Sequence, residues 1–276
     1  MLQRVPRLAA ALLIASASAS AQQQQQTPSR LQSQSQSQRQ SPAQPQRQAL
    51  PALAAAPQQA SLAERLAACT PCHGDAGRAG ADAYYPRIAG KPAGYLYNQL
   101  LNFREGRRSY PLMTRLIDPL SEPYLMEIAQ HFAALHPPYP PPAAPTMPVS
   151  ATVLARGRTL ALQGDAARRV PACAQCHGTA LTGALPATPG LLGLPLDYLN
   201  AQLGAWQTGQ RRAHAPDCMA RVVERLSNAD LHAVATWLSI QPVPADARPA
   251  ARPPAPAPGD ETLRCGSALD SPGARR

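Results

Sequence analysis

Apolar residues recur at helical spacing in two segments of the chain. In each segment they occupy positions i, i+3, i+4 and i+7, which lie on one face of a helix. The positions are Leu125, Ile128, Ala129 and Phe132 in one segment, and Leu231, Val234, Ala235 and Leu238 in the other. These helices are expected to begin after Ser121 and Ser227, whose hydroxyl groups can cap exposed amides, and Asp230 adds the carboxylate of a capping box at the second start.

Further helices are predicted upstream in both regions. Ser61 and Glu64 have the spacing of a capping box that opens a short helix running into Cys69. A longer helix is expected over 93–104 and a similar one over 196–207, each ending shortly before a glycine. No stretch alternates convincingly between polar and apolar residues as a half-buried strand does. The pattern predicts an all-α fold with long loops.

The two regions are copies of one unit. Each contains Cys-x-x-Cys-His-Gly, then Pro-x-x-x-Gly, Tyr-Leu, Gln-Leu, an arginine pair, Met and Leu-Ser in the same order. Corresponding positions are Cys69 and Cys173, Pro86 and Pro189, Tyr95 and Tyr198, Gln99 and Gln202, and Met113 and Met219. We therefore expect two small domains that share one fold.

Composition divides the rest of the chain. Arg4 and Arg7 precede a short apolar run, and Ala19-Ser20-Ala21 offers a cleavage point, which is typical of a secretory signal. Export would place the protein in the periplasm, an oxidising compartment. We expect a signal peptide over 1–21, a disordered Gln-rich leader over 22–60, a first domain over 61–136, a Pro-rich linker over 137–150, a second domain over 151–241 and a Pro/Ala-rich tail over 242–276.

The small domains are poor in core-forming residues. The chain has 32 prolines and only 4% aromatic residues, so something besides apolar packing is expected to help each domain fold. The net charge of +10 is spread along the chain, whereas a nucleic-acid interface would gather it on one helix or face. Nucleic acid is therefore not expected as a partner.

Cys-x-x-Cys-His is the pattern of covalent haem c attachment. The two thiols bond the porphyrin, and the adjacent histidine is held against the iron. The motif residues are Cys69, Cys72 and His73 in the first domain and Cys173, Cys176 and His177 in the second. A redox dithiol or half of a zinc site is the alternative for one isolated motif, but the equivalent positions in two repeats favour haem.

A sixth iron ligand must come from downstream. Met113 and Met219 share a repeat position, and each is expected in a loop just before the final helix. Thioether ligation would favour the ferrous state. A core-filling role remains the alternative for both methionines. Met126 and Met147 are weaker candidates, and His214 is an alternative sixth ligand.

Other residues are expected to support the haems. The carbonyl groups of Pro86 and Pro189 can accept the second ring N–H of each ligating histidine, or these prolines simply stiffen their loops. Haem propionates suit arginine partners. Four arginines are candidates for that role, although they could equally be solvated: Arg107, Arg108, Arg211 and Arg212.

On these motifs, both halves resemble class I cytochrome c domains, and the tandem resembles the di-haem cytochrome c4 type. The resemblance covers roughly 61–136 and 151–241. It implies two tandem all-α domains, each wrapped around one covalent haem. It also implies single-electron transfer between redox proteins, from a periplasmic or inner-membrane dehydrogenase to an acceptor such as a terminal oxidase. Peripheral membrane association remains open.

Two cysteines remain after the haem motifs are assigned. In an exported protein Cys218 and Cys265 are expected to form a disulfide, which would fasten the tail beside Met219; two independent thiols are the alternative. The alternative functions are a di-haem enzyme such as a peroxidase and a haem-based gas-binding module. Both require an open coordination site, which two methionine ligands would close.

Overall fold

The computed structural model describes residues 61–80, 84–142, 144–145, 147–255, 263 and 265–266. The expected signal peptide and leader, and much of the end of the tail, lie outside these residues. Within the described ranges, no helix combines the length and the apolar character needed to cross a membrane.

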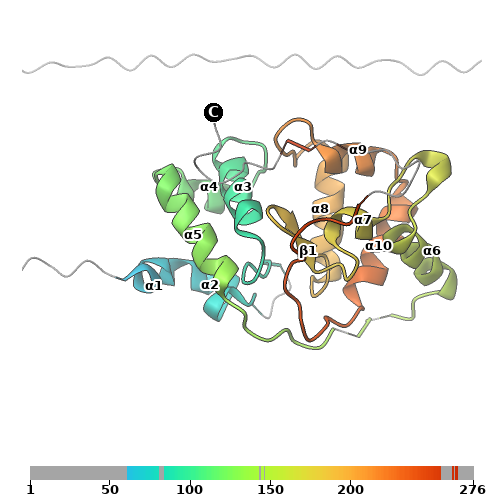
Figure 1. The fold of residues 1–276 in the computed structure, drawn as a ribbon, viewed down its shortest axis with the longest axis horizontal. Helices are drawn as coiled ribbons and strands as arrows, with labels where there is room; N and C mark the ends of the chain where they lie inside the picture. Colours follow the sequence, from blue (N-terminus) through green and yellow to red (C-terminus); the bar gives the residue numbers. More distant parts are fainter. Residues whose placement is uncertain are drawn as a thin grey trace, which may run out of the picture. The chain divides into compact units, whose positions relative to one another are not determined.

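The first repeat is built from helices joined by long loops (Figure 1). Ser61 and Glu64 form the expected capping box, and Ser121 caps the last helix of this repeat. The elements are α1 (Leu62–Arg65), the 3-10 turn η1 (Leu66–Cys69), α2 (Thr70–His73), the 3-10 turn η2 (Asp75–Gly77), α3 (Ala93–Arg104), α4 (Pro111–Ile117) and α5 (Glu122–Ala134).

The second repeat follows the same order with additions. The Ser227 and Asp230 capping box is present at the start of its final helix. Its elements are α6 (Ala151–Leu162), the 3-10 turn η3 (Ala166–Arg168), α7 (Cys173–His177), β1 (Gly183–Ala184), β2 (Thr188–Pro189), α8 (Leu196–Gln207), α9 (Cys218–Glu224) and α10 (Asn228–Ser239). The helices predicted over 93–104 and 196–207 are confirmed as α3 and α8.

Two details of the prediction were wrong. Met113 and Met219 lie in short helices, α4 and α9, and not in loops. Pro111 suits the first position of α4 because its ring presets a helical φ, and the Asp217 side chain caps α9 by accepting from the Ala220 amide. Neither helix spans two full turns, so hydrophobic periodicity could not reveal it.

A small hairpin also contradicts the expectation of no strands. Strands β1 and β2 pair antiparallel, with Gly183 opposite Pro189 and Ala184 opposite Thr188. Each strand has two residues, which is too short for alternation to be visible in the sequence. In the part of the chain that the structure describes, the other regular elements are helices and 3-10 turns, and the hairpin places Pro189 in β2.

Helix α6 belongs to the second repeat and was not predicted. Ser150 caps it by accepting from the Val153 amide, and the helix packs along α10, as Figure 1 shows. The contact depends on Gly157, because a Cβ atom there would overlap the carbonyl oxygen of Ala233. Close approach of the two backbones therefore fixes α6 against α10.

Each repeat has its own apolar core. In the first, α3 packs on α5, with Leu96 and Leu101 of α3 and Leu125 of α5 among its buried residues. In the second, α10 contacts both α6 and α8, and its core includes Leu160 and Leu199. Cys69 packs against the first core and Cys173 against the second, so each Cys-x-x-Cys-His motif lies beside the core of its own repeat.

The start of the Pro-rich segment is bound to both repeats. The Arg87 guanidinium donates to the carbonyl oxygens of Pro137 and Pro138. Its Cζ atom lies 3.7 Å from the ring centroid of Tyr139. A Cβ atom on Gly193 would lie 2.6 Å from that ring, so Tyr139 also packs closely on the second repeat. This part of the linker is therefore an element of packing as well as a connection.

Candidate haem-binding site

The two Cys-x-x-Cys-His motifs form equivalent helical turns. Helix α2 ends at His73 and α7 ends at His177. Gly74 and Gly178 follow with φ of 73° and 84°. A Cβ atom on Gly74 would collide with the Ala79 carbonyl oxygen, and one on Gly178 with the carbonyl oxygen of Gly183 in β1. Glycine is needed there because the left-handed region and the close approach both exclude a side chain.

The four motif cysteines are not in disulfides. They are partly buried, and burial raises the pKa of the Cys69 thiol and raises that of Cys173 to about 12. In the described residues, no three His, Cys, Asp or Glu side chains gather as a metal-binding group. Each repeat thus has two free thiols on one helical turn. Within this part of the chain, the further ligands that a zinc ion would need are not gathered around them.

Both histidines are buried and oriented by a proline carbonyl. His73 Nδ1 donates to the Pro86 oxygen at 2.9 Å, and His177 Nδ1 donates to the Pro189 oxygen at 2.7 Å. A carbonyl only accepts, so Nδ1 carries the hydrogen and the neutral ring keeps its lone pair on Nε2. Burial lowers the pKa of both rings, which favours that neutral form. Each Nε2 is therefore ready to act as a metal ligand.

One cavity contains the site residues of both repeats. Its volume is about 1140 Å³, and most of its lining is apolar. The cysteines and histidines of both motifs line it together with Met113 and Met219. A large apolar space edged by two thiols, an imidazole and a thioether per repeat suits a covalently attached porphyrin with its iron.

The weaker ligand candidates lie elsewhere. Met126 packs against the first core, and Met147 is 75% exposed. The His214 Nε2 atom lies 2.8 Å from Arg107 Nη2, so the ring atom that a metal would need is engaged with a residue of the other repeat. These positions leave Met113 and Met219 as the methionines directed to the cavity.

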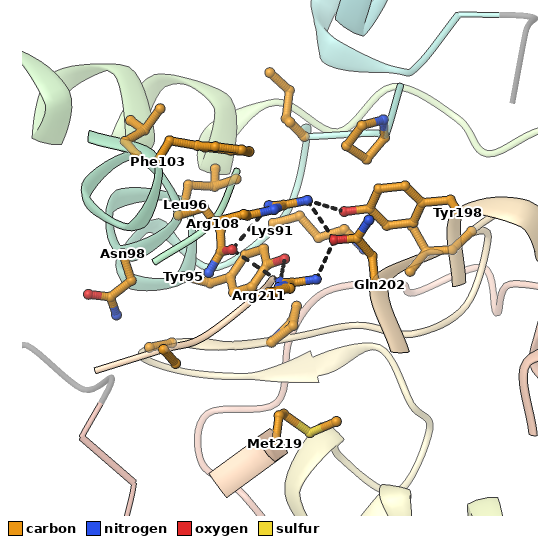
Figure 2. A pocket seen from close by; sticks show the side chains of 18 of the residues that line it. Lys91, Tyr95, Leu96, Asn98, Phe103, Arg108, Tyr198, Gln202, Arg211 and Met219 are labelled. Atoms are coloured by element: carbon orange, nitrogen blue, oxygen red, sulfur yellow. Dashed lines mark hydrogen bonds between the residues drawn. The ribbon is translucent and has the colours of Figure 1, made fainter. Parts of the chain in front are cut away.

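The arginines separate into two kinds. Arg108 and Arg211 line the cavity, and Figure 2 shows their guanidinium groups side by side between tyrosine and glutamine side chains. Arg108 Nη2 donates to Tyr198 at 3.1 Å, and Arg211 Nη2 donates to Gln99 at 3.1 Å. Among the described residues, no carboxylate forms an ion pair with either guanidinium. A buried cation without a counter-charge is costly, so this pair suits an anionic ligand.

Arg107 and Arg212 are the sequence neighbours of Arg108 and Arg211, and their partners differ. Arg107 forms an ion pair with Glu105 at 2.6 Å, and the Arg212 amide donates to the Arg107 carbonyl. Arg212 is exposed. Arg107 thus has a carboxylate partner and Arg212 is open to solvent, whereas Arg108 and Arg211 have only neutral hydrogen-bond partners among the described residues.

Lys91 is a cation of the cavity that sequence reasoning missed. It is the chain's only lysine, it is 5% exposed, and its Nζ atom donates to the carbonyl oxygen of Gly190 at 3.1 Å. Burial, and then the charge of Arg87, lowers its pKa to about 8, so the amine is charged at neutral pH. Burial is the main cause of the lowered pKa of His177, and the positive charge of Lys91 lowers that pKa further. A single lysine in an arginine-rich chain was the signal available in the sequence.

Cys218 and Cys265 form a disulfide. It joins the start of α9 to a tail residue 47 positions later. The Gly266 amide also donates to the Pro216 carbonyl oxygen at 2.9 Å. The tail is thereby fastened next to Met219.

Known proteins share this organisation, although no family model matches the chain. A thiosulfate dehydrogenase electron acceptor of Thiomonas intermedia (strain K12) is 37% identical over 190 residues, 69% of this chain and 83% of that protein. A cytochrome c4 of Thiocapsa roseopersicina is 32% identical over 192 residues, 67% of this chain and 95% of that protein.

Solved structures agree. Reduced recombinant cytochrome c4 from Pseudomonas stutzeri superposes with a TM-score of 0.55 at 28% identity, covering 63% of this chain and 94% of that one. A thiosulfate dehydrogenase (TsdBA) from Marichromatium purpuratum gives a TM-score of 0.56 at 34% identity, over 63% of this chain. The match spans 36% of that longer chain.

The duplicated helical fold and the paired motifs define a di-haem class I cytochrome c, as the sequence predicted. The chain carries two covalently bound haem c groups and acts in electron transfer, as a carrier or as a subunit of a dehydrogenase. It belongs to the cytochrome c4 family.

Proposed function

We propose that His73 with Met113, and His177 with Met219, are the axial ligand pairs of the two haems. Cys69 and Cys72 would hold the first porphyrin, and Cys173 and Cys176 the second. When bound, each haem supplies one-electron oxidation and reduction at iron. The observation that carries this assignment is the convergence of all eight side chains on one apolar cavity, with both imidazoles oriented by proline carbonyls.

The chain's own residues would keep each site closed and ordered. Pro86 and Pro189 hold the imidazole tautomers. Arg108 and Arg211 would receive the haem propionates. The other two arginines of the cavity lining have partners of their own, because Arg65 pairs with Glu127 and Arg87 donates to the carbonyl oxygens of Pro137 and Pro138. A shared cavity favours electron exchange between the two sites. The domain boundaries proposed for this arrangement are 61–136 and 151–241, with the linker at 137–150.

Optical spectra of the ferric holoprotein test the ligand assignment. Methionine ligation at both irons gives the methionine-to-iron charge-transfer band, and Met113→Ala and Met219→Ala should each remove about half of its intensity. Haem content is measured in parallel to show that both groups remain attached. If a variant keeps the full charge-transfer band, the methionine that it lacks is not an axial ligand.

We further propose that the protein does no substrate chemistry of its own. A peroxidase or gas sensor needs an open sixth position, which Met113 and Met219 would fill. Exposure of the reduced protein to carbon monoxide measures this directly. Rapid spectral change at either haem would favour an enzyme or a sensor over a carrier.

A thiosulfate dehydrogenase is the proposed electron donor, and a terminal oxidase the proposed acceptor. Two relatives at 37% and 36% identity are named as electron acceptors of thiosulfate dehydrogenase. Stopped-flow mixing of ferric protein with a purified thiosulfate dehydrogenase and thiosulfate should show reduction of both haems. Reduction no faster than that of an unrelated monohaem cytochrome c would argue against this donor.

We propose that the mature protein is periplasmic. The motif cysteines, the disulfide and the amino-terminal signal pattern fit export. Mass spectrometry of protein from the periplasmic fraction should find an amino terminus after Ala21. Recovery only in the cytoplasm would contradict this location.

A further inference from the structure

The segment that leads into α3 links the first repeat to the loop that orients the second histidine. The Lys91 Nζ atom donates to the carbonyl oxygen of Gly190. Gly190 follows Pro189, whose own carbonyl accepts the hydrogen bond from His177. A buried amine of one repeat is therefore one peptide away from the group that orients the imidazole of the other.

Gly94 brings the same helix onto the β hairpin. A Cβ atom on Gly94 would lie 2.7 Å from the Pro186 carbonyl oxygen and 3.3 Å from Ala187 Cβ. These residues form the turn between β1 and β2, and β2 contains Pro189. The hairpin that positions His177 is thus supported from outside its own repeat. Figure 2 shows Lys91 among the side chains that line the cavity.

The second repeat has no lysine at the equivalent position that could reach the first histidine's loop. Leu194 occupies the repeat position of Lys91, and it is buried in the second core. The second repeat therefore offers no amine at this position to the first. The two sites, similar in their ligands, differ in their surroundings.

The positive charge of Lys91 changes the relative stability of the ferric and ferrous forms of a nearby haem. Ferric haem carries one more positive charge than ferrous haem, so a nearby cation destabilises the ferric form more. Salt screens a buried charge much less than an exposed one. The amine of Lys91 therefore favours the reduced state of a haem ligated by His177.

We infer that Lys91 is a positioning residue of the second haem site: it supports the hairpin that orients His177 and raises the reduction potential of that haem. This inference rests on the ligand assignment proposed above. If the holoprotein lacks two haems, that assignment fails first. If both haems are present, the variants below test Lys91 separately.

Potentiometric titration of the holoprotein, followed optically, measures the potential of each haem. Met219→His marks the second haem beforehand, because replacing its sixth ligand moves its wave. Lys91→Leu installs the residue found at the matching repeat position, and Lys91→Arg keeps the charge. Arg115→Leu removes an exposed positive charge of the same repeat and serves as the control.

Lys91→Leu should shift the second wave to lower potential and leave the first in place. Lys91→Arg and Arg115→Leu should leave both waves close to the wild type. The inference is overturned if Lys91→Leu moves neither wave, or both equally, or if Lys91→Arg shifts the second wave as much as leucine does. Should Lys91→Leu lose haem, Lys91→Met, with an unbranched side chain, provides the same comparison.

Discussion

Gln99 and Gln202 are equivalent residues of the two repeats, and each accepts hydrogen bonds from both Arg108 and Arg211. Gln202 Oε1 lies 2.8 Å from Arg108 and 2.6 Å from Arg211, while Gln99 Oε1 lies 3.1 Å from each. Each arginine thus bonds its own repeat and the other one. The symmetry of the duplicated sequence becomes a symmetric contact between the copies.

Gln202→Leu should destabilise this contact. It removes an acceptor from two cations in the cavity, and unsatisfied charged donors should cost about 2–3 kcal/mol of unfolding free energy. Gln207→Leu is the control, because Gln207 bonds the exposed Asn228 side chain and its loss should cost less than about 0.5 kcal/mol. Denaturant unfolding of the holoprotein gives both values. Equal losses of unfolding free energy in the two variants would show that the hydrogen bonds to Arg108 and Arg211 stabilise the protein no more than an exposed hydrogen bond does.

Gly157→Ala should destabilise the second repeat. The added methyl group would collide with the Ala233 backbone, so α6 must move from α10, at a cost of about 1–3 kcal/mol. Gly204→Ala provides the opposite result, since a Cβ atom at that helical position meets nothing within 4 Å and should stabilise by up to about 1 kcal/mol. Melting curves of the two variants should therefore move in opposite directions.

Removal of the disulfide should act on one methionine. The double variant Cys218→Ser, Cys265→Ser frees the tail, and loss of such a cross-link typically costs about 2–4 kcal/mol. Because Cys218 precedes Met219, the charge-transfer band should weaken by up to half, while the Met113 contribution stays. Ferric spectra at increasing temperature measure this. An unchanged band throughout would show that α9 holds Met219 without the tail.

Acid should weaken the second repeat through Asp230. Hydrogen bonds from Arg168, Ser227 and Arg156 hold the pKa of this carboxyl well below its ordinary value. Its contribution is therefore present above the unfolded-state pKa of about 3.9 and is lost as pH falls toward the lower folded value.

Asp230→Asn tests this pH dependence. It should cost about 2 kcal/mol near neutrality and make stability less dependent on pH below about 4. Asp246→Asn, in an exposed pair with Arg248, should leave the neutral-pH stability almost unchanged. Chemical unfolding at several pH values compares them. If the unfolding free energy of Asp230→Asn falls with pH as steeply as that of the wild type, the acid sensitivity belongs to other groups.

The sequence predicted those parts of the fold whose signals are local. The long helices have a clear apolar period, and the Ser227 and Asp230 capping box is a short-range pattern. Helix α6 was missed even though Ser150 caps it, because its stripe is interrupted by Gly157. That glycine has meaning only beside Ala233, a residue distant in sequence.

The site shows the same division. His73 and His177 were found because haem attachment needs contiguous residues. The roles of Arg108 and Arg107 could not be separated, since adjacent arginines look alike until packing turns one toward the cavity and the other toward Glu105. Lys91 escaped notice because its partner, the Gly190 carbonyl, belongs to the other repeat.

The anchoring of Tyr139 between Arg87 and Gly193 changes what a break in the Pro-rich segment would do. A protease that cut after residue 140 would leave Tyr139 attached to the first fragment and still packed on the second. The fragments would then stay together as a non-covalent complex and separate only on dilution. Limited proteolysis would thus report two bands on a denaturing gel and one species in solution.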